Sequence, residues 1–125
     1  MIQVLLVGAG GFVGSIARYV IVSLAQSTWV SSFPIGTLIV NVTGCLAVGW
    51  LSELFQSRPF LDSEVRGFLI IGLLGSFTTF SAFGHETVTL LRDNGAGVAS
   101  INVAANLLLT VAAVWLGRAI AQFVG

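Results

Sequence analysis

The stretch that decides the fold is GFLIIGLLGSFTTFSAFGHE, residues 67–86. Its first half is apolar enough to lie inside a lipid bilayer, whereas its second half places hydroxyl groups, a histidine and a glutamate among phenylalanines. Ser76, Thr78 and Thr79 can hydrogen-bond to backbone groups and draw them out of a helical ladder. We therefore expect a membrane-spanning helix that is broken in its middle.

The rest of the chain shares this apolar character. Only 8% of the 125 residues are charged and 56% are hydrophobic, whereas a soluble domain carries roughly 25% charge. A spanning helix needs about 20 mostly apolar residues, and four runs of the sequence qualify. We predict an all-α integral membrane protein, a single domain over residues 1–125 with four transmembrane helices, approximately at residues 2–24, 36–52, 67–91 and 97–117. Asp62 is a candidate N-cap for a helix that starts near Ser63.

The arginines set almost no preferred orientation. Four spans put both termini on one side of the membrane together with Arg58, Arg66 and Arg118, and they put Arg92 on the other side, joined by Arg18 if its side chain reaches that surface. Arginine and lysine counts in the flanking loops decide orientation, and three against two is nearly balanced. A chain without bias can insert both ways up, which suggests an antiparallel homodimer of dual topology.

The first span contains a glycine pattern with two readings. Residues 4–15, VLLVGAGGFVGS, carry Gly8, Gly11 and Gly14 at the spacing of a dinucleotide-binding loop, but the acidic residue expected about 20 positions later is missing. We therefore do not expect an enzyme. Gly10 and Gly14 form a GxxxG pair, which lets membrane helices approach closely. A net charge of zero also argues against a nucleic-acid partner.

Polar side chains inside the predicted spans are the candidate functional residues, because such groups usually face a bundle interior or a wet cavity. Asn41 lies in the middle of the second span. Asn102, Asn106 and Thr110 repeat every four residues along the fourth span, which puts them on one helical face. These groups can join helices by hydrogen bonds, or they can line a polar track, and the sequence leaves both open.

Two charged residues lie within the spans. Arg18 either extends its side chain to the interface or attracts an anion at a pore mouth. Glu86 is either a water-facing residue near the end of the third span or a vestibule charge. His85 beside it is assigned no chemistry.

Phe80 and Phe83 lie three residues apart after the expected break. An aromatic ring has a negative face and a positive edge, so edge-on rings can wall a path for a small anion. Thr79 and Ser81 can satisfy the break or supply hydrogen bonds along that path. The alternative is that the two rings only pack on one helical face. Carbonyl groups freed by the break suit a bare cation.

Three segments together resemble a known family. GGFVGSIARY (10–19), PIGTLIVNVTG (34–44) and GLLGSFTTFSAFGHE (72–86) are similar to the Fluc/CrcB family of bacterial fluoride channels, and the resemblance covers the whole chain. It implies a fluoride-selective channel in the bacterial inner membrane that exports fluoride passively from the cytoplasm and lowers its toxicity. It also implies an antiparallel dual-topology homodimer with two pores.

The resemblance further implies roles for single residues. Asn41 would be a pore donor, and Phe80 and Phe83 would turn their ring edges to fluoride. Backbone carbonyl groups of Gly75 and Thr78, from both subunits, would hold a structural sodium ion at the dimer interface. Asn102, Asn106 and Thr110 fall where the family has a polar face, and Arg18 matches the arginine of its first helix.

The sequence departs from the common family pattern at Ser76, Ala82 and Gly84, and Ala82 removes a hydroxyl from the expected polar path. The main alternative function is a small dual-topology proton-coupled cation or multidrug transporter. That function needs a membrane-embedded carboxylate, for which Glu86 is the only candidate. A heterodimer with a paired copy also stays open.

Overall fold

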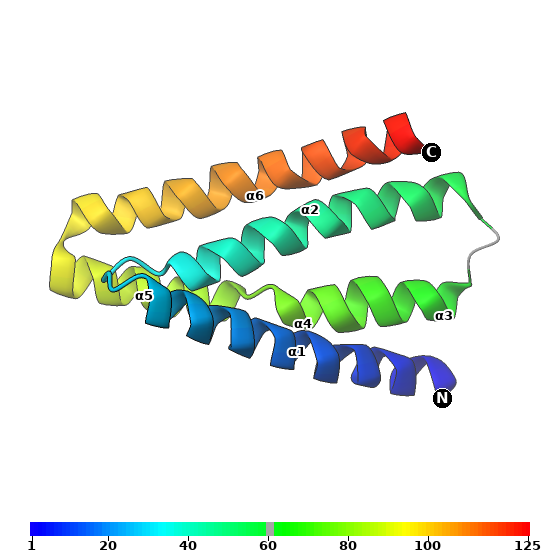
Figure 1. The fold of residues 1–125 in the computed structure, drawn as a ribbon, viewed down its shortest axis with the longest axis horizontal. Coiled ribbons are helices and arrows are strands. Elements are labelled where there is room, and N and C mark those ends of the chain that lie inside the picture. The colour runs from blue at the N-terminus through cyan, green and yellow to red at the C-terminus, as the bar shows by residue number, and fades with distance from the viewer. Residues whose placement is uncertain (60–61) are drawn as a thin grey trace.

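A computed structural model describes residues 1–59 and 62–125 of the chain, and these residues form helices joined by short turns. Four helical segments are long and apolar enough to cross a membrane: α1 (Ile2–Thr28), α2 (Ile35–Ser57), the interrupted segment Ser63–Asn94, and α6 (Ala96–Val124). They are longer than the predicted runs because hydropathy marks only the part within hydrocarbon, whereas the helical backbone continues into the interface. Both termini lie at the same end of the bundle (Figure 1).

The third spanning segment consists of four pieces. It begins with α3 (Ser63–Arg66) and the π-helix η1 (Gly67–Leu74), and it continues through α4 (Gly75–Phe77) to α5 (Phe80–Asn94). The break lies at Thr78 and Thr79, whose backbones are extended, with ψ angles of 155° and 120°. The sequence analysis did not predict the π-helix. Asp62 occupies the N-cap position of α3, as predicted, although its side chain makes no capping hydrogen bond.

The spanning segments pack as two pairs. α1 lies along η1, and α2 lies along α6, and Figure 1 shows the two pairs diverging toward the end where the termini lie. Glycines make both pairs close. A Cβ atom on Gly10 or Gly14 would collide with backbone atoms of η1, and one on Gly49 would collide with the backbone of α6. The glycines of residues 4–15 therefore serve helix packing inside α1, and the dinucleotide-binding reading fails.

The interior of the bundle contains polar side chains among small and apolar ones, and its exterior is apolar. The buried polar side chains are those of Thr37, Asn41, Thr79, Asn102 and Asn106. Large apolar side chains are exposed along the outside, such as those of Phe12, Leu108 and Trp115. A chain in a bilayer gains nothing by burying apolar side chains away from lipid, because lipid tails are equally apolar. The polar groups that lipid cannot satisfy are gathered inside.

Candidate functional site

Asn41 of α2 satisfies the backbone at the helix break. The Thr79 amide donates to Asn41 Oδ1 at 2.8 Å, and Asn41 Nδ2 donates to the Thr79 carbonyl at 3.1 Å. Both residues are buried, each with 8% of its surface exposed. An unsatisfied backbone group at membrane depth costs several kcal/mol. The asparagine amide therefore replaces the partners that a continuous helix would have supplied.

Thr79 also starts the helix that follows the break. Its Oγ1 accepts from the Ala82 amide at 3.2 Å, which makes Thr79 the N-cap of α5. The same oxygen lies 3.3 Å from Ser81 Oγ. A capping threonine satisfies one of the amides left free in the first turn of a helix. The third segment can therefore resume as a helix immediately after two extended residues.

A cavity of about 340 Å³ lies beside the break. Its walls come from α2, the break itself, α5 and α6, and the lining residues are Asn41, Cys45, Thr78, Thr79, Phe80, Phe83, Val103, Asn106, Leu107 and Thr110. Most of the pore residues predicted from the sequence thus meet in one place. The ring centroids of Phe80 and Phe83 are 5.4 Å apart with an interplanar angle of 52°. Apolar ring surface and polar groups face the same space.

Two of the three residues on the predicted polar face of α6 line this cavity, and the third is buried away from it. Asn41 Nδ2 also donates to Asn106 Oδ1 at 3.2 Å, and Thr110 donates to the Asn106 carbonyl at 2.5 Å. Asn106 and Thr110 line the cavity. Asn102 does not line it, since it is fully buried and bonds to Asn106 and Thr87. Asn102 therefore joins α6 to α5 by a hydrogen bond.

A second, larger cavity of about 540 Å³ brings the two charged residues together. Arg18 of α1 and Glu86 of α5 both line it, along with Ser81, Ala82 and Thr79. Thr79 lines both cavities, so the break is the wall between them. His85, next to Glu86, is exposed.

Thr37 is a residue of this cavity that the sequence analysis missed. Its hydroxyl donates to Glu86 Oε1 at 2.7 Å, and it is almost fully buried. Glu86 Oε2 is buried and has no partner among the described residues. The available signal was the position of Thr37 four residues before Asn41, which puts both side chains on one face of α2.

The break takes two backbone carbonyl groups out of the helical hydrogen-bond pattern. In a continuous helix the carbonyl groups of Gly75 and Thr78 would accept from the amides of Thr79 and Ala82. Those amides donate instead to Asn41 Oδ1 and Thr79 Oγ1. Gly75 is an exposed residue. Neutral carbonyl oxygens are the ligands by which proteins replace the hydration of an alkali cation.

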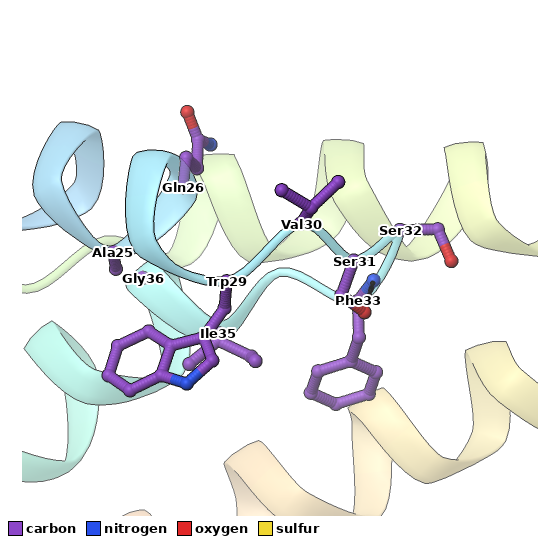
Figure 2. Close-up of a pocket in the computed structure, with 9 residues that line it drawn as sticks. All are labelled: Ala25, Gln26, Trp29, Val30, Ser31, Ser32, Phe33, Ile35 and Gly36. Atoms are coloured by element: carbon purple, nitrogen blue, oxygen red, sulfur yellow. Dashed lines mark hydrogen bonds between the residues drawn. The ribbon is translucent and has the colours of Figure 1, made fainter.

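A third cavity, of about 280 Å³, lies at the turn between α1 and α2. Figure 2 shows Trp29, Phe33 and Ile35 on one side of this turn and Gln26 and Val30 on the other. Aromatic side chains are common at the membrane surface. None of the residues predicted for the site lies here, and we assign this cavity no chemistry.

Comparison with known proteins agrees with this geometry. The family model described as CrcB-like protein, Camphor Resistance (CrcB), matches residues 5–118. The chain is 43% identical over 119 residues to the fluoride-specific ion channel FluC of Prosthecochloris aestuarii, which covers 95% of this chain and 92% of that relative. It is 45% identical over 121 residues to the protein of the same name from Elusimicrobium minutum, covering 95% and 93% of the two chains.

A third relative is the fluoride-specific ion channel FluC 3 of Methanosarcina barkeri, which is 40% identical over 121 residues and covers 97% of this chain and 91% of that relative. The matches run through all four spanning segments, including the break and both cavities. The chain therefore belongs to the CrcB-like protein family.

Proposed function

We propose that this protein is a fluoride-selective ion channel through which fluoride leaves the cytoplasm passively. Its relatives carry the name fluoride-specific ion channel. The observation that supports the same role for this chain is the cavity at the break, where two phenylalanine rings face the same space as Asn41, Asn106 and Thr110.

The chemistry of the cavity suits a small, strongly hydrated anion. Fluoride entering it would lose water, and hydroxyl and amide donors can replace those hydrogen bonds. The positive edges of Phe80 and Phe83 add a weak attraction that does not trap the ion. Conduction requires binding that is favourable enough to enter and weak enough to leave. Asn41 already directs both of its amide hydrogens at protein acceptors. It would donate to fluoride only by exchanging one of them.

A second copy of the chain, inserted the opposite way up, would complete the site. Phe80 has 83% of its surface exposed, and Gly75 at the break is also exposed. A two-fold related partner would cover both and would close the cavity on its open side. The near balance of arginines across the membrane supports an antiparallel homodimer of dual topology. The resemblance to bacterial fluoride channels is the basis for placing the protein in the inner membrane of a bacterium.

The carbonyl groups of Gly75 and Thr78 would hold a structural sodium ion at the centre of that dimer. The ion would bind neutral oxygens from two chains and so fix the two breaks against each other. Removal of sodium tests whether this ion is bound at the break. Replacing sodium by N-methylglucamine, which is too large for a carbonyl cage, should lower the thermal midpoint of the purified dimer. An unchanged midpoint would exclude the ion.

The alternative of a proton-coupled cation transporter is not favoured. Its substrate cation would meet Glu86 in the same cavity as the positive charge of Arg18. The relatives over the full length of the chain are named as fluoride channels.

Ion efflux from liposomes tests the proposed function. The purified protein is reconstituted into vesicles loaded with potassium fluoride or potassium chloride, and each ion is read with its own electrode after valinomycin is added. Rapid loss of fluoride with chloride retained is the expected result. Retention of both ions by a folded dimer would refute the channel, and equal loss of both would refute the selectivity.

A further inference from the structure

We propose that Asn102 is a positioning residue for permeation: it sets the direction of the Phe80 and Phe83 rings without reaching the ion. This inference rests on the proposed channel function. It begins from the burial of Asn102, which has 0% of its surface exposed although its neighbour Asn106 lines the cavity. A fluoride ion in the cavity would therefore meet Asn106 and not Asn102.

Asn102 joins two chains of hydrogen bonds that lead to α5. On one side its Oδ1 and its carbonyl accept from Asn106 Nδ2 at 3.1 and 3.0 Å. Asn106 in turn accepts from Asn41, which holds both backbone groups of Thr79. On the other side Asn102 Nδ2 donates to Thr87 Oγ1 at 2.9 Å. Thr87 then donates to the Phe83 carbonyl at 2.7 Å.

The direction of every bond in this series is fixed by its ends. The Thr79 amide is only a donor and its carbonyl only an acceptor, so Asn41 can be oriented in one way. Asn41 Nδ2 then donates to Asn106 Oδ1, and the Nδ2 of Asn106 must face Asn102. Asn102 is left with its own Nδ2 for Thr87. A series of donors aligned in one direction is mutually strengthening at low dielectric.

The series holds the first turn of α5 at two levels, Thr79 at its start and Phe83 one turn later. Phe80 and Phe83 project from that turn, so rotation of α5 about its axis would turn both rings. Asn102 is the residue in contact with both branches, because it bonds to Asn106 and to Thr87. Its removal would detach the Phe83 level from α6, and it would leave Asn106, which holds the Thr79 level through Asn41, with only the backbone carbonyl of residue 102 as an acceptor.

The test uses three substitutions and two measurements. Asn102→Leu removes both side-chain bonds and keeps the same branching with the same number of side-chain heavy atoms. Thr87→Val removes the hydroxyl that links Asn102 Nδ2 to the Phe83 carbonyl and leaves the Asn106 branch intact. Thr89→Val is the matched control, because Thr89 also donates to the carbonyl four residues before it, but its bond lies outside the series. Fluoride efflux from liposomes is measured together with hydrogen exchange of peptides that cover residues 77–84.

Asn102→Leu should slow fluoride efflux about tenfold, because Thr87 and Asn106 lose the buried side-chain partner that holds α5 in place. Exchange at residues 77–84 should rise in the same variant, and Thr87→Val should change both measurements in the same direction. Thr89→Val should change neither. The double variant Asn102→Leu/Thr87→Val should be no slower than Asn102→Leu, because residues acting in one series are not additive.

Three results would overturn the proposal. Wild-type efflux and exchange in Thr87→Val would do so even if Asn102→Leu failed to fold. Additive losses in the double variant would mean that the two residues act separately. Slow efflux with unchanged exchange would mean that Asn102 does not act through the break. If the wild-type protein conducts no fluoride, the channel function fails, and the exchange measurement still decides whether Asn102 holds α5.

Discussion

At the scale of single residues, the asparagine at position 41 makes a broken helix possible in a membrane. Its amide carries one acceptor and one donor group on a planar frame, which matches the amide and carbonyl of a single extended residue. Thr79 presents that pair of groups because its backbone has left the helix. An aliphatic side chain at position 41 could satisfy neither group, and a hydroxyl has a single hydrogen, which could not serve both the Thr79 carbonyl and Asn106.

Replacing Phe80, whose ring is exposed, is the most direct test of the proposed fluoride path. Phe80→Ile keeps a large apolar side chain but removes the positive ring edge. We expect a loss of fluoride efflux of tenfold or more, roughly 1.4 kcal/mol in the barrier, with the dimer still intact on size-exclusion chromatography. Phe123→Ile is the control, because Phe123 is equally exposed but lies near the end of α6. Equal fluoride efflux in the two variants would show that the Phe80 ring has no role in permeation.

The N-cap at Thr79 gives a second prediction for a single residue. Thr79→Val preserves shape but leaves the Ala82 amide without its acceptor. The loss of a capping hydroxyl costs about 1 kcal/mol, so the thermal midpoint should fall, while Thr79→Ser should retain the wild-type value. Thr43→Val removes a hydroxyl that only bonds along its own helix and serves as the control. A midpoint in Thr79→Val equal to that of Thr43→Val would show that the cap is dispensable.

At the scale of helices, the close contact of α1 with η1 depends on glycines in both. Gly10 and Gly14 in α1 and Gly72 in η1 have backbone atoms of the partner where a Cβ would stand. The π-helix brings the carbonyl groups of Phe68 and Leu73 toward α1 at these positions. Wide turns of this kind occur mostly at functional sites, and here the wide turn leads directly into the break.

Gly14→Ala tests that contact. The added methyl group would meet the Leu73 carbonyl, so α1 and η1 would have to separate. Overpacking of this kind costs about 1–3 kcal/mol, and the thermal midpoint of the purified protein should fall by several degrees. Gly97→Ala is the control, because nothing lies within 4 Å of the added atom. If the two variants have the same thermal midpoint, the contact between α1 and η1 does not depend on Gly14.

The number and type of the elements could be predicted from the sequence, because hydropathy over about 20 residues records a simple requirement of the bilayer. The break could be predicted as well, since Ser76, Thr78 and Thr79 compete for backbone bonds in an otherwise apolar run. The π-helix could not, because residues 67–74 form an apolar run in which no residue marks a wider turn. The role of Thr37 was missed because its partner Glu86 lies 49 residues away, on another helix.

At the scale of the whole molecule, the two helix pairs contribute different residues to the two cavities. The α2 and α6 pair supplies the asparagines, and the α1 and η1 pair leads into the break and contributes Arg18 to the larger cavity. α5 packs mainly against α6 and carries the rings, Glu86 and Thr87. Glu53 of α2 joins Arg118 and Gln122 of α6 near the terminal end, which neutralises one of the arginines on that side.

That balance of charge predicts how the chain assembles. Gln3→Lys with Gln56→Lys adds positive charge at the terminal end, and Ser27→Lys with Thr28→Lys adds it at the opposite end. Because lysine and arginine are retained on the cytoplasmic side, each pair should force one orientation. If the active unit is antiparallel, cells that produce either variant alone should stay sensitive to fluoride, and cells that produce both should regain resistance. The control is the wild-type chain, which should protect cells alone. Full protection by a single biased variant would mean that the channel does not require two opposed chains, and that the exposed rings of Phe80 face lipid or a parallel partner instead.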